Sequence, residues 1–296
     1  AQHPQIVPSM EKELRHFGME NPDWHNTKVY NMRFHPKAHP RVQLAIEGSV
    51  YYLSDPTAPP QIRALYPRTR IIILLRDPAA HCHSAFRSAR PHRVPACADL
   101  ATGLPLHEQR RRGSYRPCDQ PSHYVESLER WAAHFPASQI LVLYTEDLHT
   151  NMTAQLTRIE AFLDLTPFPW AQAALRSMHV APAKSPPAIV VTGSSVEQCM
   201  APACHQAVRT LKALFPGSPP PVWPSCAQGG SSSVLESPKP WVAMVLNLFS
   251  RKSNAELRTG SVVLLPSQAL AVANRIGYCA KQRCAVLVYL DNFTQR

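Results

Sequence analysis

Residues 70–86, RIIILLRDPAAHCHSAF, constrain the fold of this 296-residue chain more than any other stretch. The apolar run from Ile71 to Leu75 does not alternate with polar residues, which is typical of a strand buried on both faces. The pattern then changes to helical spacing within two residues of this run. Asp77 suits the N-cap of that helix and Pro78 its first position. The stretch therefore predicts a buried strand that passes through a tight turn into a helix.

The predicted strand ends on Arg76, where α/β proteins usually bind ligands. In open α/β sheets, ligands lie beyond the carboxyl ends of the strands, and helix N-termini there offer free N–H groups to anions. A guanidinium at that position can bind a phosphate in a bidentate manner. Asp77, His81 and Ser84 are spaced four and three apart and so share one helix face. The alternative is that Arg76 is a surface charge at a strand end and that Ser84 has no ligand.

A second strand–helix unit follows later in the chain. Residues 139–144 read as another buried strand, and residues 151–165 as an amphipathic helix. Repeated strand-then-helix order predicts a parallel sheet, since parallel strands need such crossovers. Between the two units, residues 87–116 form a basic, Pro-containing segment without clear periodicity, which we interpret as either a binding loop or a solubilising insertion.

The charge of the chain favours an anionic partner. Lys and Arg total 31 against 20 acidic residues, a net charge of +11. Nucleic acid, acidic lipid and sulfated glycan all fit this charge, but the basic residues lie in a Pro-rich segment without interleaved aromatic residues, which argues against nucleic acid. No apolar run reaches the roughly 18 to 20 residues that a bilayer crossing needs.

Eight cysteines leave three possibilities open. Cys199/Cys204 and Cys279/Cys284 each enclose four residues, a spacing that permits small disulfide loops or, with His205, part of a zinc site. Free thiols are the third possibility. Two glycosylation sequons, at Asn151 and Asn292, are compatible with a secretory compartment.

The pattern Arg76-Asp77-Pro78, with Ser84 and Phe86 on the following helix, resembles the 3′-phosphate-binding motif of the PAPS-dependent carbohydrate sulfotransferases, the Golgi family that includes the heparan sulfate and chondroitin enzymes. His81 replaces the Arg that is usual in this family. The resemblance covers roughly residues 3–168. It implies a P-loop-NTPase-like parallel sheet flanked by helices, PAPS as co-substrate without a metal, and binding of the 3′-phosphate by Arg76 and Ser84.

Two further segments resemble the acceptor side of these enzymes. Lys12 to Phe17 is similar to a family segment in which Glu acts as the general base, so Glu13 is implied as the base, with Lys12 and Arg15 facing an acidic glycan. The alternative is a solvated charge cluster. Glu47, in EGSVYYL, is similar to a residue of the acceptor cleft, although a buried structural carboxylate is equally compatible with the sequence.

The resemblance also indicates a missing part. In the family, a strand and a loop that binds the 5′-phosphosulfate precede a segment like His3 to Ile6. This sequence contains no such loop. We therefore expect the first strand and this loop to be absent. The alternative function that follows is a truncated, non-catalytic relative that binds an anion or glycan. Another nucleotide-dependent transferase, such as a kinase, would need a Gly-x-x-x-x-Gly-Lys loop, which the sequence lacks.

From these features the sequence predicts three parts: a sulfotransferase-like α/β domain at 1–168, an irregular Pro/Ser-rich segment at 169–240 with one short helix at 204–215, and a C-terminal segment of unknown character at 241–296. The predicted function is transfer of a sulfuryl group from PAPS to a hydroxyl or amine of a glycosaminoglycan-like acceptor, acidic or neutral. The predicted location is the Golgi lumen or outside the cell, with membrane contact only through an upstream anchor.

Overall fold

A computed structural model describes residues 3–11, 13–34, 44–89, 118–170 and 195–227, together with short strands at 246–251, 286–287 and 292–293. Its strands are β1 (Ile6–Pro8), β2 (Leu44–Glu47), β3 (Ile71–Leu75), β4 (Ile140–Tyr144), β5 (Leu246–Arg251), β6 (Val286–Leu287) and β7 (Asn292–Phe293). Its helices and 3₁₀ turns are α1 (Thr27–Asn31), η1 (Val50–Leu53), α2 (Ala58–Leu65), α3 (Pro78–Ala89), α5 (Asp119–Ser122), α6 (Tyr124–His134), η3 (Ala137–Gln139), α7 (Thr145–Thr150), α8 (Met152–Leu163), α9 (Val196–Leu214) and η4 (Pro224–Cys226).

The predicted α/β architecture with parallel strands is confirmed, but the sheet is mixed rather than wholly parallel. β1 pairs with β2 and β3 with β4, both in parallel, and the strand order is β1-β2-β5-β3-β4. β5 lies antiparallel between β2 and β3. The sheet departs from the predicted parallel sheet because residues 246–251 supply a central strand of opposite direction.

The four strands β1 to β4 nevertheless run in the same direction. β2 and β3 are each antiparallel to β5, so they are parallel to each other. The chain therefore leaves β1, β2, β3 and β4 at one edge of the sheet, the edge at which open α/β sheets bind ligands. Residues 13–17, which we call the Glu13 segment, follow β1; Glu47 ends β2; Arg76 follows β3; and Glu146 follows β4.

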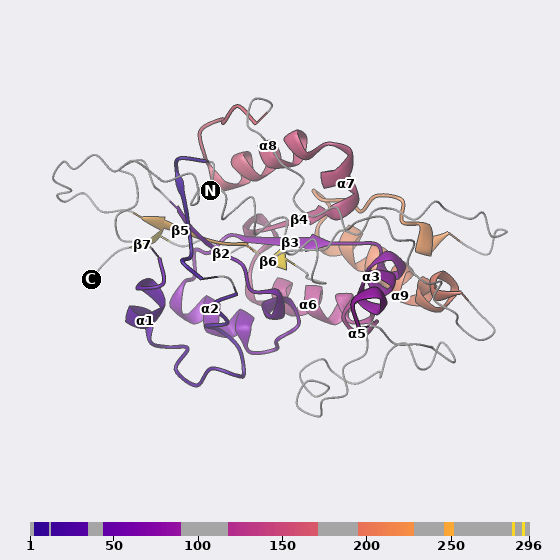
Figure 1. Cartoon of the computed structure of the whole chain (residues 1–296), viewed down its shortest axis with the longest axis horizontal. Helices are drawn as coiled ribbons and strands as arrows, with labels where there is room; N and C mark the ends of the chain where they lie inside the picture. Colours follow the sequence, from indigo (N-terminus) through magenta and orange to yellow (C-terminus); the bar gives the residue numbers. More distant parts are fainter. Residues whose placement is uncertain are drawn as a thin grey trace.

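Helices cover both faces of the sheet. In Figure 1, α7 and α8 lie on one side of β3 and β4, while α2 and α6 lie on the other, and α3, α5 and α9 gather beyond the end of β3. Every residue of β3 and β4 is buried, as expected for strands covered on both faces. Trp131 of α6 is fully buried, and its indole donates a hydrogen bond to the carbonyl of Leu53 at 3.2 Å. α6 is thereby joined to the end of η1.

α9 is longer than the predicted helix at 204–215. It begins at Val196, where Ser195 forms a capping box with Gln198, and ends at Leu214. Cys204, Ala207 and Leu211 belong to the same hydrophobic core as the sheet. The prediction missed the first two turns because Pro202 interrupts the helical pattern. The proposed three-part division of the chain stays a prediction.

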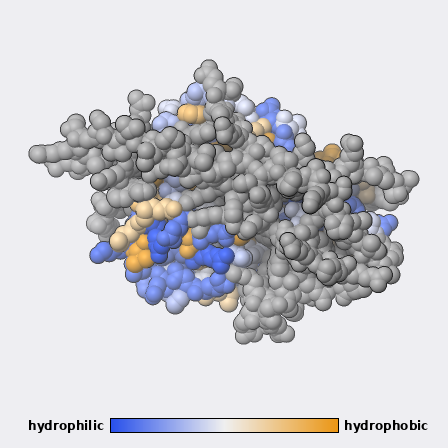
Figure 2. Space-filling model, in the orientation of Figure 1, coloured by the Kyte–Doolittle hydropathy of each residue, from blue (hydrophilic) through white to orange (hydrophobic). Residues whose placement is uncertain are grey.

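The described surface carries mostly isolated exposed apolar side chains. Within the ranges described above, no helix combines the length and the hydropathy needed to cross a bilayer. Figure 2 shows the described part of one face around α1 as mainly hydrophilic with a few hydrophobic residues. Exposed large apolar side chains include Met10, Val29 and Met32.

Candidate functional site

The turn from β3 into α3, residues 75–78, which we call the Arg76 turn, has the predicted geometry. α3 begins at Pro78, and the carboxylate of Asp77 accepts a hydrogen bond from the backbone N–H of Ala80 at 2.9 Å. This bond satisfies one of the N–H groups that the first turn of a helix leaves without a partner. Arg76 lies directly before this cap and is only 4% exposed. The strand end thus holds a buried guanidinium at the N-terminus of a helix.

Helix α7 and the loop after α9 hold this turn. The Glu146 carboxylate accepts a hydrogen bond from the backbone N–H of Asp77 at 2.9 Å and from the indole of Trp223 at 3.4 Å. The second oxygen of Asp77 accepts from the N–H of Ser225 at 3.0 Å. A disulfide between Cys204 and Cys226 ties the same loop to α9. The conformation of the turn is therefore fixed from three sides.

The groups around Arg76 have pKa values that reflect burial and its charge. Burial raises the pKa of the Glu146 carboxyl, and the Arg76 guanidinium opposes that shift. Burial, followed by the positive charge of Arg76, lowers the pKa of His149 from 6.5 to about 4. Burial also raises the pKa of the Tyr124 phenol, which hydrogen-bonds the main chain of Arg76. At neutral pH, His149 and Tyr124 are thus both uncharged.

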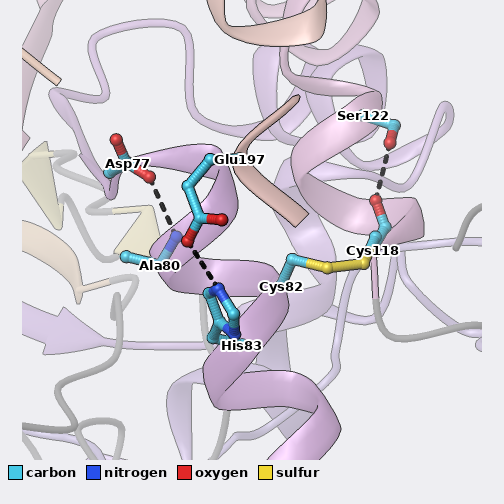
Figure 3. Close-up of a disulfide and its surroundings, with 7 residues drawn as sticks. All are labelled: Asp77, Ala80, Cys82, His83, Cys118, Ser122 and Glu197. Carbon is cyan, nitrogen blue, oxygen red and sulfur yellow. Dashed lines mark hydrogen bonds and ion pairs between the residues drawn. A yellow bond between two sulfur atoms is a disulfide. The ribbon is translucent and has the colours of Figure 1, made fainter. Parts of the chain in front are cut away.

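The first turns of α3 carry the other predicted residue, Ser84, which is buried. On the same face, His81 Nδ1 lies 2.7 Å from the hydroxyl of Tyr124. Figure 3 shows the neighbouring face, where His83 meets Glu197 of α9 at 2.8 Å and a disulfide joins Cys82 to Cys118. The helix that bears Ser84 is consequently fastened both to α9 and to the residue before α5.

These pairings agree with the expected presence of disulfides but give Cys204 another partner. Cys204 is bonded to Cys226, so a small loop between Cys199 and Cys204 is wrong. The four-residue spacing misled because both residues lie on α9, where Cys204 faces the core and meets a loop that follows the helix. A disulfide sulfur is also not available as a zinc thiolate beside His205. Across the described residues, no group of three or more metal-ligating side chains is found.

The Glu13 segment has an unusual backbone. Glu13 and Arg15 both have positive φ, at 51° and 48°, a conformation that costs energy for residues other than glycine. The guanidinium of Arg15 lies 3.5 Å from the Glu13 carboxylate and 4.3 Å from the centre of the Tyr51 ring. About half of the Arg15 side chain is exposed, whereas the Glu13 side chain is 16% exposed. The segment therefore presents a cation to solvent and keeps its carboxylate mostly covered.

Glu47, the last residue of β2, lies beneath this segment and is 1% exposed. Its carboxylate accepts hydrogen bonds from three hydroxyls: Ser49 at 2.5 Å, Tyr52 at 2.9 Å and Tyr30 at 2.8 Å. Burial, followed by the charge of Glu47, raises the pKa of the Tyr52 phenol, which keeps it a neutral donor. Of the two roles that the sequence allowed for Glu47, these contacts describe the structural one, and contact with an acceptor stays a prediction.

The remaining predicted residues are Lys12, Asn151 and Asn292. Lys12 and the side chain of Asn292 lie outside the described residues, as does most of the basic segment at 87–116. Asn151 is exposed, and its side chain accepts a hydrogen bond from the N–H of Ala154 at the start of α8. Its glycosylation stays a prediction.

Sequence reasoning overlooked Glu146, His149, Tyr124 and Trp223 around Arg76. One signal could have indicated Glu146, because it follows the second buried strand and the ends of neighbouring parallel strands meet at one edge of a sheet. Tyr124 and Trp223 gave no such signal. Their positions depend on how α6 and the loop after α9 pack.

With this geometry established, comparison with known proteins shows which proteins the chain resembles. Residues 52–170 match the sulfotransferase family. The resemblance to sulfotransferases is therefore confirmed for a segment that contains Arg76 and Ser84, whereas Glu13 and Glu47 precede it.

The chain is also similar to two curated heparan sulfate N-deacetylase/N-sulfotransferases. The chain is 29% identical over 182 residues to human bifunctional heparan sulfate N-deacetylase/N-sulfotransferase 2, and 30% identical over 167 residues to N-deacetylase/N-sulfotransferase 1 of Xenopus tropicalis. These matches cover 56% and 54% of this chain, but only 20% and 19% of the relatives. The chain thus spans about a fifth of the length of these curated relatives. A solved sulfotransferase from Alicyclobacillus acidocaldarius aligns at 20% identity with a TM-score of 0.47, covering 72% of this chain and 87% of that one.

Proposed function

We propose that this chain is a PAPS-dependent sulfotransferase that acts on a hydroxyl or amine of a glycosaminoglycan-like acceptor. The observation that carries the proposal is the Arg76 turn, a guanidinium at a strand end directly before a capped helix, inside the segment that matches the sulfotransferase family. The relatives named for N-sulfation of heparan sulfate favour an amine of that polymer as the acceptor group.

Arg76 and Ser84 would hold the 3′-phosphate of PAPS. Both belong to one strand–helix unit, which would place a charged fork and a hydroxyl on the same anion. The neutral state of His149 suits this role, because the nearby imidazole then leaves the positive charge to Arg76. PAPS itself would supply the sulfuryl group, and the chain would act mainly by positioning and charge stabilisation.

On the acceptor side, Glu13 would remove the proton of the attacking group as the bond to sulfur forms. A carboxylate is adequate for this step if it lies within hydrogen-bond reach of the acceptor. Arg15, whose side chain is about half exposed beside Glu13, would bind a carboxylate or sulfate of the glycan, and Lys12 would add a second cation. Glu47, predicted as an acceptor-side residue, is proposed to support this side from beneath, since its buried carboxylate contacts hydroxyls of the protein.

Two disulfides between described residues support a location in the secretory pathway. Cys82–Cys118 and Cys204–Cys226 both join separate elements, and such bonds persist in oxidising compartments. The Golgi lumen is the compartment we propose, by analogy with the family resemblance.

The proposal is tested with 3′-phosphoadenosine 5′-phosphate and ³⁵S-labelled PAPS. Calorimetry should show binding of the nucleotide that Arg76→Ala weakens by about 100-fold and Ser84→Ala by about 10-fold, the sizes expected for lost charged and neutral hydrogen bonds. With N-deacetylated heparosan as acceptor, label should enter the polymer, and Glu13→Gln should lower kcat by about 100-fold or more.

Arg68→Ala is the matched control, since Arg68 is an exposed arginine three residues before the amino end of the same strand. It should leave nucleotide binding unchanged. Nucleotide binding without transfer to any glycan, in a folded sample, would instead support the non-catalytic, anion-binding relative. Absence of nucleotide binding would contradict both the cofactor site and the enzyme.

A further inference from the structure

A buried network links Glu47 to the backbone of the Glu13 segment. The hydroxyl of Ser49 accepts a hydrogen bond from the N–H of Arg15 at 3.1 Å. The hydroxyl of Tyr52 accepts from the N–H of His16 at 2.8 Å and from that of Phe17 at 3.2 Å. Three consecutive backbone N–H groups therefore end on two hydroxyls.

The direction of these bonds depends on Glu47. A hydroxyl has a single proton, so it orients its lone pairs toward a backbone N–H only when that proton is directed elsewhere. Both hydroxyl protons are directed to the same oxygen of Glu47. An ionised carboxylate only accepts hydrogen bonds, so it fixes Ser49 and Tyr52 as acceptors for the segment above them.

The segment needs such support because its backbone is strained. Glu13 and Arg15 have the positive φ values given above, and non-glycine residues keep this conformation only where their surroundings impose it. The aromatic packing adds to this support. The ring of His16 stacks on Tyr30 at 4.4 Å, and Phe17 packs edge-on against both Tyr30 and Tyr52. Tyr30 also donates to the other oxygen of Glu47.

We propose that Glu47 is a positioning residue that acts through Ser49 and Tyr52 to hold the Glu13 segment in the strained conformation from which Glu13 reaches the acceptor. The role assigned to Glu13 rests on the proposed function, whereas the restraint on the segment does not. Glu47 itself is buried and contacts hydroxyls of the protein, so its effect on the reaction is indirect.

Hydrogen exchange of the backbone amides at positions 15 to 17 tests the restraint without any activity. Glu47→Gln places an amide N–H where one hydroxyl proton was accepted, and Tyr52→Phe removes the acceptor of two N–H groups. Each variant should speed exchange at His16 and Phe17 by roughly five- to tenfold, the effect of losing about one hydrogen bond. Exchange in β3 and β4 should not change.

Tyr30→Phe is the matched control. It removes one hydroxyl from the same carboxylate but keeps the ring that stacks on His16, and the Tyr30 hydroxyl receives none of the three N–H bonds. Exchange at positions 15 to 17 should stay within about twofold of the wild type. If Glu47→Gln unfolds the protein, exchange will rise throughout the sheet, and Ser49→Ala together with Tyr52→Phe then decides the question. Unchanged exchange at 15 to 17 in folded Glu47→Gln or Tyr52→Phe would overturn the proposal.

Kinetics separate positioning from general destabilisation. In the active enzyme, Glu47→Gln should lower kcat by about 10- to 100-fold, as expected for a misplaced base, with little change in KM for PAPS or in nucleotide affinity. A parallel loss of nucleotide affinity would contradict a role confined to the Glu13 segment. If the wild type binds nucleotide but transfers no sulfuryl group, the proposed function fails, while the exchange data still decide whether Glu47 restrains the segment.

Discussion

The Arg76 turn and the Glu13 segment lie at the same edge of the sheet but are held by different chemistry. In the Arg76 turn, carboxylates accept hydrogen bonds directly from backbone N–H groups, as Asp77 does from Ala80 and Glu146 from Asp77. In the Glu13 segment, two hydroxyls stand between the Glu47 carboxylate and the backbone. Direct contact keeps a regular helix start in place, whereas the relayed contact holds a strained backbone.

This difference indicates how each region should respond to substitution. The Arg76 turn combines a local cap, from Ala80 to Asp77, with partners 69 and 148 positions away, on α7 and in the loop after α9. The Glu13 segment depends on partners 34 to 36 positions away. We therefore expect a substitution among the partners of one region to weaken that region and leave the other unchanged. Both regions should be weakened only by substitution of a residue that supports both.

Trp131→Ala should have the largest effect and should weaken both regions. Trp131 fills the core beneath η1 and donates to the carbonyl of Leu53, next to Tyr52. Loss of a fully buried Trp typically costs about 3–5 kcal/mol. Urea denaturation should show this loss, together with faster exchange in the Glu13 segment and weaker nucleotide binding. Intact nucleotide binding at full affinity would show that the Arg76 turn does not depend on this part of the core.

Glu146→Ala should affect the Arg76 turn alone. It leaves the N–H of Asp77 and the indole of Trp223 buried without their acceptor, at a cost of about 1–3 kcal/mol for each such group. Unfolding free energy and nucleotide affinity should fall, while amide exchange at His16 and Phe17 stays at the wild-type rate.

Glu126→Ala provides the comparison for Glu146→Ala, because Glu126 is a largely exposed carboxylate paired with His123 on α6. It should change the free energy of unfolding by no more than about 0.5 kcal/mol. Faster exchange in the Glu13 segment of Glu146→Ala would mean that the two regions are coupled after all.

The mildest perturbation is a change of pH, which titrates one histidine in each region and removes no side chain. Burial is the main cause that lowers the pKa values of both His16 and His149 from 6.5 to about 4, and Arg76 contributes to the shift of His149. Because the unfolded chain binds these protons near pH 6.5 and the folded chain only near pH 4, unfolding takes up protons between these values. Stability should therefore decrease as the pH falls from about 6.5 to 4.

Histidine titration by NMR sharpens this comparison. Arg76→Met should raise the pKa of His149 only part of the way toward 6.5, because burial remains, and should leave the pKa of His16 unchanged. An equal shift of both histidines would indicate a change in the whole fold rather than the loss of a local charge.

The same contrast explains what the sequence could predict. β3, its turn and the start of α3 follow from residues 71–78, where strand pattern, cap and Pro adjoin one another. β4 and α8 are equally local. The contacts of Glu47 were not predictable, because they join Tyr30, Ser49 and Tyr52 to the Glu13 segment through the tertiary fold. The partner of Cys204 depends in the same way on where the loop after α9 returns.

The position of β5 has a consequence for how the chain is made. The strand between β2 and β3 is drawn from residues 246–251, so the ribosome releases both of its neighbours long before it. Until then, the β1–β2 pair and the β3–β4 pair have open facing edges, and strands with open edges are prone to pair with other chains. A nascent chain is therefore exposed to such pairing until a late segment joins the two halves of the sheet.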